Sequence, residues 1–192
     1  QSYIVAGQLL PPSATDEEIK ISYMNYAIGG SFTARLNMNL REDKSWSYGV
    51  RTRLSDAKGQ RAMLVRAPVQ TDKTSESITE IVNEYAAYLS TSPTTEDELA
   101  KGKASKTLRL PGQFETLGAL KGGVSDIVTY DRDLDYLNKL PQLLDEPSLE
   151  DVHAMAQKYI KPDQWTWLIV GDLSKIEEPI RKLNLGPVEV LD

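Results

Sequence analysis

The sequence predicts an α+β fold, in which a mainly antiparallel sheet carries helices packed on one face. The predicted elements follow the order strand, two helices, two-strand hairpin, a run of about five helices, strand and helix. That order lacks the strict alternation of strands and helices that a doubly wound parallel sheet requires. Two of the strands are also joined by a short polar loop, which is the connection of an antiparallel pair.

The first quarter of the chain predicts one strand and two helices. Residues 3–9 predict the strand, which two prolines end. The pattern of a capping box at residues 15–18 predicts the start of a helix, and Gly29 and Gly30 predict its end. A second, shorter helix is expected from about Ser31.

The next stretch predicts a β-hairpin. Apolar and polar residues alternate over residues 48–54, which is the period of a strand. Residues 55–60 contain Asp, Lys and Gly and predict the turn, after which residues 62–69 return as the second strand.

The rest of the chain is predicted to be helical, except for one apolar strand near the end. Apolar residues at helical spacing, together with capping signals at Thr95 and Ser148, support this assignment. The expected helices are residues 78–89, 95–110, 114–130, 133–144, 148–160 and 174–183, and the strand is residues 165–170.

Composition excludes several classes of function. The chain has 192 residues, which suits one domain, and its net charge of −6 argues against a nucleic-acid binder. It has no cysteine and a single histidine, so it cannot carry a thiolate zinc site or a His-x-x-Glu-His motif. No apolar run approaches the ~20 residues needed to span a bilayer.

Most polar motifs have a structural interpretation. His153 lies on the apolar side of its helix without a second histidine, so a partly buried helix residue is expected rather than a metal ligand. The acidic runs at residues 16–18 and 96–98 fall in first helical turns, where they complement the helix dipole. The Gly29–Gly30 pair lacks the lysine of a phosphate-binding loop, so it is interpreted as a helix stop.

The richest segment is residues 29–50, in which Arg41 falls near a helix end and Tyr48 starts the next strand. A cation and a phenol on rigid elements on either side of one turn can point into a common space. Such a pair suits the binding of peptide carbonyls or of a developing oxyanion. By pattern alone, the alternative that Arg41 complements the helix end and Tyr48 packs in the interior is favoured.

This segment resembles the insulinase-like zinc metallopeptidases, peptidase family M16, which also includes the mitochondrial processing peptidases. The resemblance is to the second, non-zinc half of that family, where a Gly-Gly-x-Phe-x-x-Arg-Leu stretch leads to Leu-Arg-Glu and then to Tyr-Gly. The matching positions in this sequence are Gly29, Gly30, Phe32, Arg35, Leu36, Leu40, Arg41, Glu42, Tyr48 and Gly49. Residues 1–4 and 167–172 resemble the early and last strands of the same half.

The resemblance implies a clamshell of two homologous α+β halves that close around a peptide substrate. Zinc is expected in the partner half, bound by His-x-x-Glu-His, and no metal or other cofactor is expected in this chain. Arg41 would hold a substrate carbonyl, and Tyr48 would donate a hydrogen bond to the oxyanion as the catalytic group of this half. This chain alone is then expected to be inactive, and the zinc-bearing half would lie in the same chain or in a separate subunit.

Two alternatives stay open beside this interpretation: a structural or assembly subunit of the same fold without proteolytic role, and an unrelated small-molecule binding domain. Residues 1–192 are expected to form a single domain of a longer chain, because the sequence starts in a strand without an initiating methionine. A periplasmic and a cytoplasmic location in a bacterium both stay open, with the periplasm favoured. The family often has Gly where this chain has Ser45, so a positive φ there would cost on the order of 1 kcal/mol.

Overall fold

The computed structural model describes residues 1–191 and contains a four-stranded antiparallel sheet in the order β2-β3-β1-β4. The strands are β1 (Ser2–Leu10), β2 (Arg51–Leu54), β3 (Arg61–Val69) and β4 (Thr166–Val170). Every pairing is antiparallel, with β1 in the centre between β3 and β4. The predicted α+β class and the antiparallel sheet are therefore confirmed.

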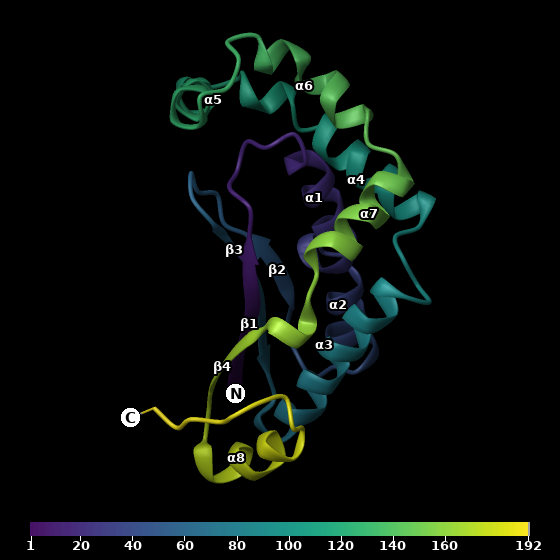
Figure 1. Cartoon of the computed structure of the whole chain (residues 1–192), viewed down its shortest axis with the longest axis vertical. Helices are drawn as coiled ribbons and strands as arrows, with labels where there is room; N and C mark the ends of the chain where they lie inside the picture. The colour runs from purple at the N-terminus through teal and green to yellow at the C-terminus, as the bar shows by residue number, and fades with distance from the viewer. Residues whose placement is uncertain (192) are drawn as a thin grey trace.

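The helices lie mainly on one side of this sheet, as Figure 1 shows. The longest, α3 (Thr74–Leu89), runs along the sheet, and α7 (Leu149–Tyr159) packs beside it and against α1 (Glu18–Asn25). The other helices are α2 (Arg35–Asn37), α4 (Glu96–Thr107), α5 (Leu117–Tyr130), α6 (Tyr136–Asp145) and α8 (Leu173–Lys182). In Figure 1, α5 and α6 lie at the top and α8 at the bottom.

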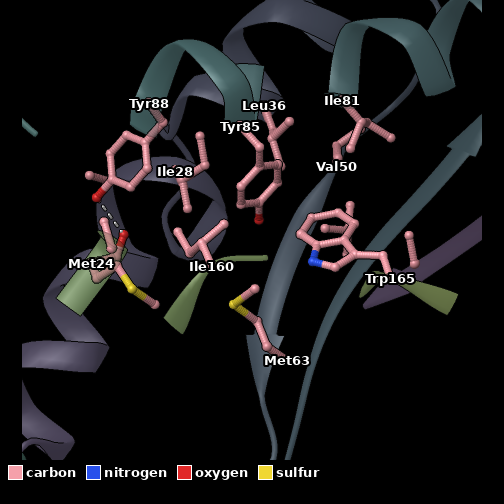
Figure 2. Close-up of a cluster of buried hydrophobic side chains, with 14 of the residues drawn as sticks. Met24, Ile28, Leu36, Val50, Met63, Ile81, Tyr85, Tyr88, Ile160 and Trp165 are labelled. Atoms are coloured by element: carbon pink, nitrogen blue, oxygen red, sulfur yellow. Dashed lines mark hydrogen bonds between the residues drawn. The ribbon is translucent and has the colours of Figure 1, made fainter. Parts of the chain in front are cut away.

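The core lies between the sheet and α3. Alternate residues of the strands, such as Ile4 and Met63, are fully buried, and Figure 2 shows Met63 in one cluster with Ile81 of α3. The rings of Tyr85 and Trp165 meet edge to face with their centroids 4.6 Å apart. Burial of these aromatic side chains, together with the aliphatic ones around them, holds the sheet and helices together.

The buried tyrosines of α3 have partners for their hydroxyl groups. Tyr85 shares a hydrogen bond of 3.0 Å with the hydroxyl of Thr52, and Tyr88 donates to the carbonyl of Met24 at 3.0 Å. Burial raises the pKa of Tyr88 to about 12, so this phenol stays protonated and keeps its donor. These bonds remove the cost of burying a polar group and fix α3 against β2 and α1.

Two apolar surfaces stay uncovered among the described residues. On the sheet face away from the helices, Tyr3 pairs with Val170 and Val5 pairs with Leu168, and three of these four side chains are exposed. The second surface is a stripe on α5 at helical spacing, and its exposed members are Leu117, Leu120, Val124 and Val128. Contiguous exposed apolar side chains mark interaction surfaces.

The structure confirms two of the predicted helix starts and corrects a third. Thr95 and Ser148 each form a complete capping box, at the starts of α4 and α7. No capping box forms at residues 15–18, because α1 begins at Glu18 and the Glu18 carboxylate accepts a hydrogen bond from the Ala14 N–H instead. Glu18 is thus used to fix the turn before α1, and Glu17 accepts hydrogen bonds from Lys158 instead of forming a cap.

The second helix starts later than predicted. Residues 31–34 form a turn closed by the Ala34 N–H and the Ser31 carbonyl, and α2 begins at Arg35. The preceding helix does end at Gly30, as predicted, through a π-helical turn (Tyr26–Gly30). Among residues 1–191, no helix is both long and apolar enough to cross a membrane.

Candidate functional site

Arg41 lies in a π-helical turn (Met38–Asp43) that continues α2 and ends close to the sheet. After this turn the chain folds back on the carbonyl of Leu40, which accepts hydrogen bonds from the N–H groups of Trp46 and Ser47. Leu40 is itself 1% exposed. The segment that separates Arg41 from Tyr48 is therefore anchored to the core through Leu40, which directly precedes it.

The Arg41 guanidinium is oriented by an aromatic ring. It stacks over Phe32, with 4.5 Å between its central carbon and the ring centroid, and Nη1 lies 2.9 Å from a carboxylate oxygen of Glu42. About one third of the side chain stays exposed (33%), although Nη1 itself is buried. Arg41 can thus offer the exposed part of its guanidinium to a carbonyl or carboxylate of a ligand.

Tyr48 projects into solvent from a fixed backbone. Its side chain is 88% exposed, and its hydroxyl makes no hydrogen bond with any described residue. The neighbouring Ser47 hydroxyl donates to the Pro68 carbonyl at 2.6 Å and accepts from the Gly49 N–H at 3.0 Å. The phenol is therefore a free donor held on a restrained loop.

Asn37 joins the two parts of the site, and the sequence gives little sign of this. It is 2% exposed, donates to the Phe32 carbonyl at 2.7 Å and accepts from the Val50 N–H at 2.9 Å. One side chain thus fixes the backbone of the residue that stacks on Arg41 and the backbone that follows Tyr48. An asparagine inside a helical segment is unfavourable by propensity, which is the only local signal of such a role.

The predicted strand at residues 48–54 is too long by three residues. Strand β2 begins at Arg51, because the N–H of Gly49 goes to Ser47 and the N–H of Val50 goes to Asn37, so neither joins the ladder with β3. Tyr48 therefore lies in the loop and not on a strand. No hydrogen bond or cation–π contact joins the side chains of Arg41 and Tyr48, so each reaches solvent by itself.

Ser45 adopts a left-handed conformation, with a φ of 55°. Its carbonyl accepts a hydrogen bond from the Gln70 side chain at 3.0 Å, which fixes the turn. A residue with a Cβ is strained at this φ by roughly 1–2 kcal/mol, whereas glycine is not.

Ser45→Gly is therefore expected to raise the melting temperature by about 1–4 °C, since the relief of strain exceeds the entropy that glycine adds to the unfolded chain. Thermal unfolding measures this. Ser125→Gly in α5 is the matched control, because the same change in a helix interior lowers stability. If Ser45→Gly lowers the melting temperature as the control does, the turn is not strained at this position.

Arg35, which belongs to the same motif, has a structural role. Its guanidinium binds the Glu98 carboxylate with two bonds of 2.7 Å and stacks over Tyr88 at 5.2 Å. Burial raises the pKa of Glu98, but the hydrogen bonds from Arg35 and Thr95 outweigh it and hold the pKa below its usual value. This ion pair ties α2 to the start of α4.

The residues that the structure describes do not fit a metal site. No group of three His, Cys, Asp or Glu side chains lies close enough together in residues 1–191 to hold a metal ion. His153 is half-buried, and its Nε2 lies 2.7 Å from the Thr94 carbonyl, which agrees with the structural interpretation.

Comparison with known proteins identifies a family. Residues 1–106 match the sequence family described as the peptidase M16 inactive domain. A search of curated protein sequences finds no match.

Solved structures share the fold at low identity. The peptidase M16 inactive domain from Pseudomonas fluorescens superposes with a TM-score of 0.79 at 19% identity, over 88% of this chain and 40% of that one. The periplasmic protease PqqL from Escherichia coli gives 0.72 at 20% identity, over 88% and 19%. Complex III2 from Candida albicans contains a chain that gives 0.72 at 12% identity, over 96% and 46%. This chain spans less than half of each of these three proteins.

Proposed function

Because this chain belongs to the peptidase M16 family, whose inactive domain it matches over residues 1–106, we propose that it is the substrate-clamping, non-catalytic half of a zinc-dependent peptidase. Arg41 and Tyr48 are the groups that it supplies to a substrate peptide. The observation that carries this proposal is the free Tyr48 hydroxyl, 88% exposed on a loop whose backbone is fixed on both sides. A tyrosine that only packs would bury its ring.

Each of the two residues has a distinct task. The Arg41 fork, oriented by Phe32, donates to a carbonyl of the bound peptide and so holds it in place. The Tyr48 hydroxyl donates to the oxygen of the scissile carbonyl, where negative charge develops in the transition state. Arg41 is thus expected to affect mainly binding, and Tyr48 mainly the rate.

The proposal includes a zinc-bearing partner half, in the same chain or in a separate subunit. The residues described here do not fit a zinc site, so the metal is assigned to that partner. The two uncovered apolar surfaces, on the sheet and on α5, support a partner because they would be buried by association. Residues 1–192 are proposed to be one domain of such an assembly.

Arg41→Lys in the assembled peptidase tests the task of Arg41. The lysine keeps the charge and loses the planar fork, so KM is expected to rise about tenfold while kcat changes much less. Steady-state kinetics on a peptide substrate measure both constants. Arg181→Lys is the control, because Arg181 forms an i,i+4 pair with Glu177 on α8 and should leave both constants unchanged. A KM equal to that of the control, with an unchanged melting temperature, would contradict the proposal.

A second candidate is a structural or assembly subunit without proteolytic role. The similarity to a chain of complex III2, over 96% of this chain, is the observation that favours it. The two candidates make opposite predictions for the peptidase kinetics of Arg41 and Tyr48 variants, since a scaffold has no proteolytic step that these residues could affect. The same kinetic experiment therefore separates them.

A further inference from the structure

A cavity of about 430 Å³ lies at the end of the sheet where the β2–β3 hairpin turns. Residues of α1, the hairpin, the last turn of α4 and α6 line it, and Figure 1 shows these elements together near the top of the molecule. The site proposed for the peptide lies at the other end of β3, where Ser47 bridges Val69. Arg61 and Val69 are the two ends of β3, which places the two sites roughly 25 Å apart at ~3.3 Å per residue.

The lining of this cavity carries more positive than negative charge, although the chain as a whole is acidic. Four cations line it against two carboxylates, and these six residues are Arg61, Lys106, Arg109, Arg132, Glu18 and Asp56. Arg132 is neutralised, because Glu18 and Asp126 each accept from it at 2.8 Å. Lys106 and Arg109 therefore carry the excess charge, because neither forms an ion pair with a described residue, whereas Arg61 lies within ion-pair distance of both lining carboxylates.

Arg61 is a buried cation with incomplete pairing. It is 2% exposed, and its Nη1 lies 3.8 Å from Glu18 and 3.6 Å from Asp56, beyond hydrogen-bond distance from either carboxylate. Its Nε and Nη2 have no hydrogen-bond partner among the described residues. A buried guanidinium in this state raises the positive potential at the base of the cavity.

Lys106 lines the same cavity and has no counter-ion among the described residues. No described carboxylate lies within ion-pair distance of its ammonium group, which instead sits 5.6 Å from the centroid of the Tyr23 ring. Burial lowers the pKa of Lys106, and the nearby Arg109 lowers it further. Lys106 also lines an adjoining cavity of about 280 Å³.

We propose that this cavity binds a small multivalent oxyanion, through Lys106 and Arg109 at its mouth and the positive field of Arg61 beneath. Lys106 lies in the last turn of α4 and Arg109 lies two residues after its end, and both line the cavity, so they can reach the same ligand. Water molecules would satisfy the hydrogen-bond donors of Lys106 and Arg109 without neutralising their charge. An oxyanion would both accept their hydrogen bonds and neutralise the charge. Charge-assisted bonds from lysine and arginine suit phosphate and carboxylate groups alike.

Titration calorimetry at constant ionic strength tests this, with pyrophosphate and citrate as the probes and sodium chloride as the reference. We expect saturable binding of one equivalent of at least one probe, together with a rise in melting temperature that chloride does not produce. Binding of pyrophosphate alone would assign phosphate chemistry, and binding of citrate alone would assign carboxylate chemistry. Absence of saturable binding by both probes would overturn the proposal.

Matched variants separate a site from general electrostatics. Lys106→Met and Arg109→Gln are each expected to weaken binding about tenfold or more, and Arg109 is exposed, so its variant should fold. Lys101→Met removes the same charge from the same helix outside the cavity and should leave the affinity unchanged. Equal weakening by Lys101→Met and Lys106→Met would show a non-specific field and overturn the proposal.

Discussion

Replacing Tyr48 with phenylalanine in the assembled peptidase is expected to lower kcat by about 10²–10³, the usual effect of deleting one oxyanion donor. The change removes only the hydroxyl group of Tyr48, which makes no hydrogen bond with a described residue. Tyr48 itself is 88% exposed. The melting temperature should therefore stay unchanged. A lower kcat with an unchanged KM would place the lost interaction in the transition state.

The control for this variant is Tyr26→Phe, which removes the hydroxyl of a half-buried tyrosine in the π-helical turn after α1, away from both uncovered apolar surfaces. It should leave kcat unchanged. A kcat for Tyr48→Phe within twofold of the wild type would remove the catalytic role of Tyr48 and favour the structural candidate.

Asn37→Ala is expected to cost about 2–4 kcal/mol of stability, because it leaves a buried N–H of Val50 and a carbonyl of Phe32 without their partners. For a chain of this size, that loss corresponds to a melting temperature lower by about 5–15 °C. Thermal or denaturant unfolding measures it. The variant should also free the loop that carries Tyr48.

Asn83→Ala in α3 is the matched control, because Asn83 is exposed and makes no side-chain hydrogen bond with a described residue. Asn37→Asp gives a second comparison, since aspartate keeps the acceptor for Val50 and loses the donor to Phe32. If Asn37→Ala costs no more than Asn83→Ala, then Asn37 does not organise the site.

The strands were predictable wherever their backbone N–H and C=O groups bond only to the backbone of a neighbouring strand. Strands β1, β3 and β4 follow their period and their bounding residues, and each matches its predicted range to within one residue at either end. The start of β2 was not predictable, because the N–H of Val50 pairs with Asn37, thirteen positions earlier. Tertiary hydrogen bonds of this kind leave no periodic signal.

The same distinction applies to the sites. Arg41 and Tyr48 could be named from a local motif, whereas Phe32 acquires its role only through stacking on Arg41. The charged cavity was not predictable, because Arg61 and Lys106 come from elements that meet only in the fold. The capping boxes lie at the other extreme, since all of their partners lie within four residues.

The central claim is that this chain completes a peptidase whose metal site lies elsewhere. The direct measurement is cleavage of a peptide by the zinc-bearing half with and without this chain, together with metal analysis of each component. We expect this chain alone to hold no stoichiometric zinc and to cleave nothing, and cleavage to appear only when both halves are present. One equivalent of zinc retained by this chain after dialysis, with chelator-sensitive cleavage, or full activity of the zinc-bearing half alone, would contradict the claim.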